Sequence, residues 1–160
     1  MCIQREKGFS LVEVLVVIAL IGIMLGIGGP AVISRMSHIK FTRAVRDVAT
    51  ELNAARLKAI AESKPMQVAF SGATYRLREC NSAPCADDEW TDYPSRGARD
   101  LGTGASITAP GSAFTVAFFA NGTATATVIC IRNTSDAGDQ MRISVTGTTG
   151  LVKVTTGCTT

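Results

Sequence analysis

The chain has 160 residues, a formal net charge of +3 and a hydrophobic fraction of 46%. This length suits one domain with a core of its own and is too short for two comfortable ones. The mild charge comes from scattered basic residues, so it does not by itself argue for nucleic-acid binding.

An uncharged apolar run from Val14 to Ile33 lies close to the N-terminus. As a helix it would extend about 30 Å, roughly the thickness of the hydrocarbon core of a bilayer. A secretory signal peptide would have a shorter run that ends in a small-residue cleavage site, and no such site follows here. A buried helix of this length would be exceptional in so small a domain. The sequence therefore favours a membrane-spanning helix.

A carboxylate, Glu13, lies directly before this run. An anion at the start of a membrane helix costs a few kcal/mol unless something compensates it. In the simplest interpretation Glu13 lies at the membrane interface, where water and the helix N-terminus stabilise the anion. That interpretation leaves unexplained the motif around it, Lys7-Gly8-Phe9-Ser10-Leu11-Val12-Glu13.

The motif resembles the class III signal of type IV pilins and type II secretion pseudopilins. The resemblance implies that a prepilin peptidase cuts between Gly8 and Phe9, which removes residues 1–8 as a leader, and that Phe9 is then N-methylated. It also implies that Glu13 pairs with the terminal amine of a neighbouring subunit during filament assembly. Two opposite charges desolvated together offset each other's burial, and they fix the register of the subunits.

The same resemblance implies a location and partners. Residues 9–33 would cross the bacterial inner membrane once, with the head in the periplasm, and would later form part of the filament core of a pilus or pseudopilus. The partners would then be other minor and major pilins. Gly28, Gly29 and Pro30 would weaken this helix, because glycine costs about 1 kcal/mol and proline about 3 kcal/mol in a helix interior. Type IV pilins commonly carry a proline at the position of Pro30.

An amphipathic second half of the helix is predicted over residues 34–64, ending before Pro65. Together the two halves would form one helix from about Phe9 to Ser63, roughly 80 Å long. Apolar residues recur in the second half at three- and four-residue spacing, with charged residues between them. These apolar positions are Phe41, Val45, Val48, Leu52, Ala55 and Ala59.

The head, residues 65–160, consists of short predicted strands. The Asn121-Gly122 pair predicts a hairpin turn, and residues 80–104 are polar and predict an irregular loop. The result is an α+β, type IV pilin-like fold: a long N-terminal helix, membrane-spanning in its first half, packed on antiparallel β-sheet. The expected strands cover residues 66–70, 75–77, 114–119, 125–132, 141–145 and 151–154.

Four cysteines remain beyond the leader, Cys80, Cys85, Cys130 and Cys158. An even number in an exported domain indicates disulfides. Four cysteines permit three pairings, and the sequence does not choose between them. We expect Cys80 to pair with Cys85 because they are close in the chain, and Cys130 with Cys158 because that bond would tie down the C-terminus. A zinc site is the alternative, although the spacing matches the usual ligand pairs poorly.

Catalytic and cofactor motifs are not recognisable in the sequence. The single histidine, His38, is expected on the helix surface or at the membrane interface. The acidic run Asp87-Asp88-Glu89 lacks the alternation and the glycine of an EF-hand, so it does not indicate a metal site. We therefore expect that the chain is not an enzyme and that it binds no cofactor or metal.

Residues 116–154, VAFFANGTATATVICIRNTSDAGDQMRISVTGTTGLVKV, are similar to the end of the FimT/FimU and GspH group of minor pilins and pseudopilins. In some DNA-uptake members the final hairpin carries a Gly-Arg-x-Arg pattern that contacts DNA. The matching positions here read Gly150-Leu151-Val152-Lys153. Leucine therefore replaces the first arginine, and lysine replaces the second.

The geometry of the hairpin is still compatible with a DNA-binding surface. A four-residue turn over residues 146–149 would set Arg142 opposite Lys153 on the outer face of the sheet. Arg76 and Arg78 also alternate with buried positions, Arg96 and Arg99 lie in the loop, and these basic side chains could contact the phosphates of double-stranded DNA. The alternative is a solvated strand face that blocks edge-to-edge aggregation. Residues expected on the buried face of this hairpin are Met141, Ile143, Val145, Val152 and Val154.

The sequence thus predicts a minor pilin, a structural subunit of a type IV pilus tip or priming complex. Two alternatives stay open, an H-type pseudopilin of a type II secretion system and a DNA-binding minor pilin for natural transformation. Pro30 tilts the prediction toward a pilus.

Overall fold

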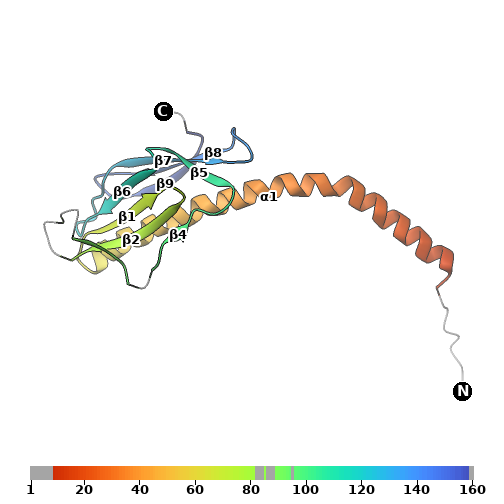
Figure 1. The fold of residues 1–160 in the computed structure, drawn as a ribbon, viewed down its shortest axis with the longest axis horizontal. Helices are drawn as coiled ribbons and strands as arrows, with labels where there is room; N and C mark the ends of the chain where they lie inside the picture. Colours follow the sequence, from red (N-terminus) through yellow and green to blue (C-terminus); the bar gives the residue numbers. More distant parts are fainter. Residues whose placement is uncertain (1–8, 82–84, 86–88, 95, 159–160) are drawn as a thin grey trace, which may run out of the picture. The chain divides into compact units, whose positions relative to one another are not determined.

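A computed structural model describes residues 9–81, 85, 89–94 and 96–158, with the backbone alone at residues 25–35. The chain divides into two compact units, the first up to Met36 and the second from Ser37 onward. Figure 1 shows the helix and strands in chain order. The cleavage position at Gly8 lies outside the described residues, and so do the side-chain surroundings of Gly28, Gly29 and Pro30.

One helix, α1, covers Leu11–Ala61, within two residues of the predicted bounds. It begins where the backbone carbonyl of Ser10 accepts hydrogen bonds from the N–H groups of Glu13 and Val14, at 3.0 and 3.3 Å. It ends just before Ser63, which has a positive φ of 53° and precedes Pro65 by two residues. Among the described residues, no helical stretch is long and apolar enough to cross a membrane.

The second half of α1 supplies the centre of the head's hydrophobic core. All six apolar positions predicted from the helical periodicity are fully buried. Burial of each large side chain among them contributes about 1.5–3 kcal/mol. Every residue of the buried core lies between Phe41 and Val145, within the second unit. The head therefore has a complete core of its own.

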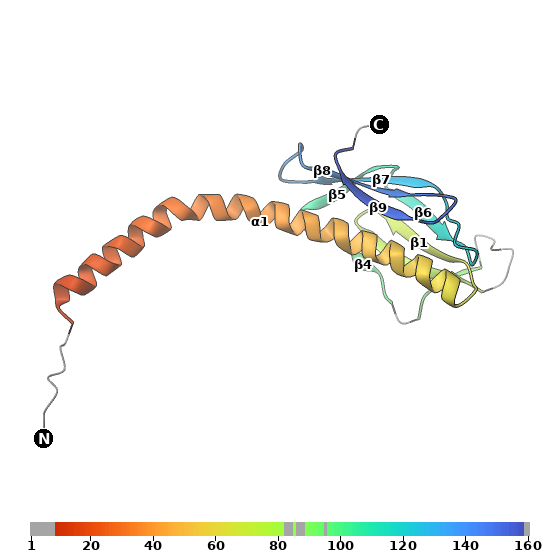
Figure 2. The ribbon, with the colours of Figure 1, turned by 180° about the vertical axis from the view of Figure 1, so that it is seen from behind.

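The first sheet pairs its strands in the order β3-β2-β1-β6, and β4 also pairs with β2. All its pairings are antiparallel, and the buried side chains of β1 and β2 contribute to the core. Figure 2 shows the second half of α1 alongside β1. The strands are β1 (Met66–Ser71), β2 (Thr74–Cys80), β3 (Trp90–Asp92), β4 (Arg99–Asp100) and β6 (Ala113–Phe118).

The second sheet has the order β5-β7-β8-β9, again antiparallel throughout. Its alternating residues Ile129, Ile131 and Ile143 are fully buried, and they face the same core. The predicted α+β class is confirmed: a long helix packs on antiparallel sheets. The strands are β5 (Ala105–Ala109), β7 (Thr127–Asn133), β8 (Gln140–Val145) and β9 (Val152–Thr156).

Two local predictions differ from the structure. Residues 80–104, expected as an irregular loop, contain the short strands β3 and β4. The Asn121-Gly122 turn forms, with φ of 83° at Gly122, but it does not close a hairpin of two paired strands. Instead β6 pairs with β1, β7 joins the other sheet, and only one isolated bridge links Phe118 to Ala124. The turn therefore carries the chain from one sheet to the other.

The C-terminal hairpin has a register two residues away from the predicted one. Its connection covers residues 146–151 rather than 146–149, so Arg142 lies opposite Thr155 and Lys153 lies opposite Ser144. The predicted Arg142–Lys153 pairing is therefore wrong, although both side chains still share one face. Val154, expected to be buried, is 40% exposed because β9 is the edge strand of its sheet.

Two disulfides form in the structure, Cys80–Cys85 and Cys130–Cys158, in the pairing expected from the sequence. The second joins β7 to the segment after β9 and closes a loop with a sequence separation of 28 residues, against 5 for the first. Because longer loops lose more conformational entropy when they are closed, the second bond constrains the unfolded chain more strongly.

Replacing Cys130 and Cys158 together with serine should lower the free energy of unfolding of the oxidised chain by about 3.5 kcal/mol. The matched Cys80→Ser/Cys85→Ser variant should lose about 2 kcal/mol, because its loop is shorter. Denaturant titration of the full chain in detergent would measure both losses. Equal losses, or a larger loss for the short loop, would contradict the assignment of the stabilising role to the Cys130–Cys158 bond.

Candidate functional site

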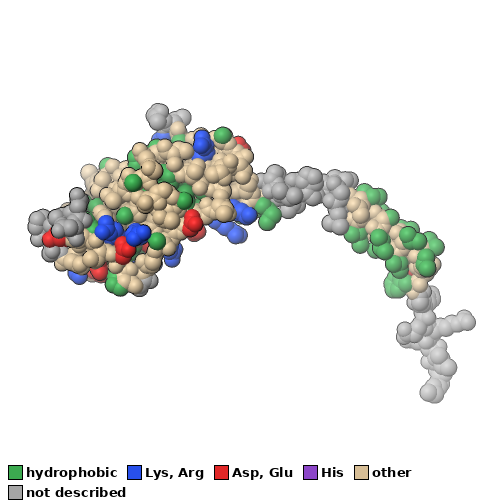
Figure 3. Space-filling model, in the orientation of Figure 1, with side chains coloured by type: hydrophobic (Ala, Val, Ile, Leu, Met, Phe, Trp, Pro, Cys, Tyr) green, Lys and Arg blue, Asp and Glu red, His purple; other side chains and the backbone are tan. Residues whose placement is uncertain are grey.

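The N-terminal segment of α1 presents an apolar surface with a single charge. Side chains from Phe9 to Met24 are exposed, with Phe9 82% and Leu11 77% accessible (Figure 3). Glu13 lies in the first helical turn, where the helix dipole stabilises an anion. Its side chain borders a shallow hollow between Phe9 and Val17. Such a surface is stable only when other apolar groups cover it.

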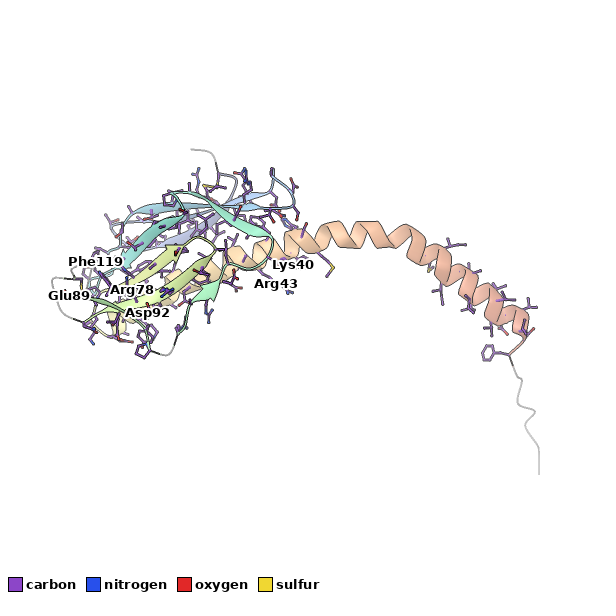
Figure 4. All side chains as sticks on the ribbon, viewed as in Figure 1. Lys40, Arg43, Arg78, Glu89, Asp92 and Phe119 are labelled. Atoms are coloured by element: carbon purple, nitrogen blue, oxygen red, sulfur yellow. A yellow bond between two sulfur atoms is a disulfide. The ribbon has the colours of Figure 1, made fainter. Side chains whose placement is uncertain are left out.

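Arg76 and Arg78 lie on β2, and both are paired within the head. The Arg76 guanidinium donates to the carboxylate of Asp92 at 3.0 Å, and Arg78 Nε lies 3.6 Å from the other oxygen of the same carboxylate. Arg78 also donates to the backbone carbonyl of Trp90. Figure 4 labels Arg78 and Asp92 on this sheet. Asp92 therefore offsets much of the positive charge predicted for this strand.

Arg142 and Lys153 lie on the other sheet, on β8 and β9. Neither makes an ion pair among the described residues. Lys153 is exposed, whereas Arg142 is half-buried and its Nε has no hydrogen-bond partner. Four of the basic residues predicted as one phosphate-contacting patch are thus divided into two pairs on separate sheets.

A buried carboxylate on α1, Glu51, was missed by the sequence reasoning. It is 2% exposed and accepts a hydrogen bond from Arg96 Nη1 at 2.6 Å, with Arg99 Nη1 3.7 Å away. Arg96 lies between β3 and β4 and Arg99 is the first residue of β4, so the ion pairs fasten this part of the chain to the helix. The available signal was position, since Glu51 lies three residues after the buried Val48 and four before the buried Ala55.

Two further side-chain clusters join α1 to residues that directly flank the strands. His38 Nδ1 lies 2.6 Å from Asp139, which also accepts a hydrogen bond from the buried Asn133. His38 is therefore on the helix surface of the head. Lys58 donates to the Tyr93 hydroxyl at 2.7 Å, and this hydrogen bond raises the pKa of Lys58 although burial opposes the shift.

Burial likewise raises the pKa of the Tyr75 hydroxyl, and the neighbouring Arg99 opposes that shift. Tyr75 therefore stays protonated at neutral pH and packs as a core residue. Among the residues that the structure describes, no cluster of three or more histidine, cysteine or acidic side chains is placed to hold a metal ion. The Asp87-Asp88 pair lies outside those residues.

A helix that continues from a Gly-Phe-x-x-x-Glu motif into a head of two antiparallel sheets defines the pilin class of filament subunits. Residues 3–29 match the prokaryotic N-terminal methylation motif. Residues 44–149 match the family described as type II transport protein GspH. The chain belongs to the GspH family, within the group that its sequence resembles. The N-terminal motif implies processing by a prepilin peptidase and assembly with other pilins.

Solved structures with the same fold come from both pseudopilins and pilins. The minor pseudopilin EpsH of the Vibrio cholerae type 2 secretion system has a TM-score of 0.58 and 12% identity, covering 73% of this chain and 97% of that chain. Escherichia coli GspH has a TM-score of 0.55 and 16% identity, covering 77% and 90%. The type IV minor pilin FimU of Pseudomonas aeruginosa has a TM-score of 0.54 and 14% identity, covering 71% and 91%.

At such low identities these likenesses establish a shared fold. No curated protein sequence matches the chain closely. Family membership and fold together support a role as a minor pilin or pseudopilin, a structural subunit.

Proposed function

We propose that this chain is a minor subunit of a type IV pilus, placed in the tip or priming complex after a prepilin peptidase has cut between Gly8 and Phe9. The observation that carries the proposal is that one chain combines a prepilin-type motif, an exposed apolar helix and a head with its own hydrophobic core. The head supplies contacts at the filament surface, and the apolar segment supplies the filament core. Pro30 favours the pilus over a secretion filament.

Before assembly, the apolar segment of residues 9–33 anchors the subunit in the bacterial inner membrane, with the head in the periplasm. The uncharged run from Val14 to Ile33 supports this location, since it matches the hydrocarbon thickness. During assembly Glu13 pairs with the methylated amine of a neighbouring subunit. The hollow beside Glu13 and Phe9 is bordered by apolar side chains, where an isolated carboxylate would lack solvation.

The test compares Glu13→Ala with Gly8→Val in the full chain, expressed in the bacterium that encodes it. Glu13→Ala should leave cleavage intact and reduce the chain in the sheared filament fraction at least tenfold, because the amine loses its partner. Gly8→Val should block cleavage, seen by N-terminal sequencing. Ser10→Ala is the control and should leave both readouts unchanged. Normal incorporation of the Glu13→Ala chain would refute the assembly role.

A second candidate is an H-type pseudopilin of a type II secretion system, favoured by membership of the GspH family. Its chemistry of processing and assembly would be the same, so Glu13 does not discriminate between the two machines. Deletion of the gene discriminates between the pilus and the secretion system. Loss of surface pili with normal protein secretion supports the pilus, and the reverse pattern supports the secretion system.

A third candidate is capture of double-stranded DNA, favoured by Arg142 and Lys153, which share one face and make no described ion pair. Removing both with alanine should reduce the salt dependence of DNA binding by about two phosphate contacts, a slope change of about 1.8. Asp92→Asn should instead strengthen binding, because it frees Arg76 and Arg78. Titration of the full chain in neutral detergent at two salt concentrations measures both effects. Binding that responds to neither change would exclude these residues.

A further inference from the structure

The exposed face of α1 at the start of the head carries a run of basic side chains. Lys40, Arg43 and Arg46 are exposed, and Ile39 beside them is 48% exposed. Residues three and four apart are neighbours on a helix surface, so these side chains lie on one face. We refer to Ile39, Lys40, Arg43 and Arg46 as the basic stripe, and Figure 4 labels Lys40 and Arg43.

The basic stripe faces away from the core of the head. Phe41 and Val45, two fully buried core residues, each lie about 160° around the helix from Arg43. His38, which contacts Asp139, lies about 140° around the helix from Arg43. The stripe is therefore separated from the sheets and from the carboxylate that binds His38, and it can meet a partner outside the head.

The positive charge of the basic stripe is not neutralised within the head. Lys40, Arg43 and Arg46 make no ion pair among the residues that the structure describes. In the sequence no acidic residue occurs between Glu13 and Asp47, and Asp47 lies one helical turn beyond Arg43. The stripe therefore has a net positive charge that an anionic partner can neutralise.

The first two cations of the stripe follow the uncharged apolar run closely. Ile33 ends that run, and Lys40 and Arg43 lie about 10 and 15 Å further along a helix. The headgroup layer of a bilayer is about 5–8 Å thick on each side, and the Debye length at physiological ionic strength is about 8 Å. Long side chains of a helix also point back toward its N-terminus. Lys40 and Arg43 therefore reach the field of the headgroups, whereas Arg46, about 20 Å along the helix, lies beyond it.

We propose that Ile39, Lys40 and Arg43 bind the headgroup layer of anionic phospholipids in the membrane that anchors the chain. This inference rests on the proposed anchoring of residues 9–33 before assembly. Each basic side chain near an anionic surface strengthens binding about fivefold, and Ile39 adds an apolar side chain at the interface. Anchoring keeps the stripe within about 15 Å of the bilayer, so the local concentration of headgroups exceeds that of any soluble acidic partner.

The experiment reconstitutes the full chain in phosphatidylcholine vesicles that contain a trace of photoreactive phosphatidylglycerol or, for comparison, of photoreactive phosphatidylcholine. After irradiation, mass spectrometry measures the lipid adducts on the peptide that spans residues 37–46. We expect about tenfold or more adduct with phosphatidylglycerol, because its net charge is negative. This preference should disappear at about 1 M salt, where the Debye length is about 3 Å. Equal labelling by the two lipids at low salt would overturn the inference.

Matched variants test which cations cause the preference for the anionic lipid. Lys40→Gln/Arg43→Gln should reduce the preference to about twofold or less, because both cations near the headgroups are lost. Arg46→Gln should reduce it by less than about twofold, since Arg46 lies more than a Debye length from the headgroups. The control is Lys64→Gln/Arg132→Gln, which removes one lysine and one arginine that are exposed outside the stripe. An equal loss of preference in the control would refute the role of the stripe.

Further readouts separate failure of this inference from failure of the proposed function or of folding. If the unsubstituted chain does not float with the vesicles in a density gradient, the proposed anchoring itself fails. If it floats but both lipids label it equally, only the lipid-binding stripe is refuted. If Lys40→Gln/Arg43→Gln keeps the lipid preference but is lost from the sheared filament fraction, the stripe contacts another subunit and the inference is wrong. Unchanged thermal unfolding of the variants verifies that the head remains folded.

Discussion

Replacing Gly150 with alanine should lower the free energy of unfolding of the head by about 3–4 kcal/mol. Gly150 has φ of +60°, which costs an L-residue about 1–2 kcal/mol. The added Cβ would also lie 2.7 Å from the Gly122 carbonyl oxygen, a backbone atom, so one of the two turns must move. Denaturant unfolding of the full chain in detergent, followed by tryptophan fluorescence, measures the loss.

Gly72 provides the matched control for this prediction. It also has φ of +60°, but a Cβ there would meet nothing within 4 Å. Gly72→Ala should therefore cost only the backbone strain, about 1–2 kcal/mol. If the two variants lose the same free energy of unfolding, the close approach of the turns at Gly150 does not contribute to the cost of the substitution.

Removing both arginines that face Glu51 should destabilise the head by about 4 kcal/mol, because it leaves a buried carboxylate without a partner. The Arg96→Met/Arg99→Met variant tests this directly, since Glu51 is 2% exposed. Adding Glu51→Leu to the same variant should restore most of the stability, because three apolar side chains can then pack together. Chemical denaturation of the three chains gives the free energies.

Single substitutions complete this cycle. Arg99→Met alone should cost less than about 1 kcal/mol, because the Arg99 side chain is 53% exposed and lies 3.7 Å from Glu51. Arg96→Met should account for most of the loss, since its hydrogen bond is 2.6 Å long. A triple variant no more stable than the double would mean that Glu51 is not the source of the penalty.

The helix was the most predictable part of the fold, because apolar residues at three- and four-residue spacing fall on one face only in a helix. Every position from Phe41 to Ala59 expected in the core is buried. The helix begins at the Ser10 carbonyl and ends shortly before Pro65. β3 and β4 were missed because they are only three and two residues long and mostly exposed, so neither has a readable alternation. Their positions depend on pairing with β2, a tertiary contact.

The register of the last hairpin illustrates a specific limit. Because side chains alternate with a period of two, a slip of two residues leaves every side chain on its original face. The pattern of Ile143 and Val145 therefore fits both the predicted turn and the observed one. In the observed turn Gly150 lies against Arg56 and Gly122, and no local sequence pattern encodes such contacts between distant segments.

The candidate site residues also divide into those that a local sequence pattern identifies and those that depend on tertiary contacts. Phe9 and Glu13 belong to a contiguous motif, so the proposal of their roles in methylation and assembly needs only the sequence. The pairing of Arg76 and Arg78 with Asp92 depended on β3, which was missed, so positive charge that Asp92 partly offsets was counted as free. Glu51 occupied a core position of the helix, but only the arginines of a distant segment explain why a carboxylate is tolerated there.

The interleaving of the two sheets has a consequence for how the head unfolds. The chain completes four strands of the first sheet, crosses to β5 in the second, returns to β6 and then finishes the second sheet. Neither sheet is therefore a continuous stretch of chain that could open while the other persists. Slowly exchanging amides of β1 and β7 should lose protection together, in one global opening, rather than as separate cooperative units.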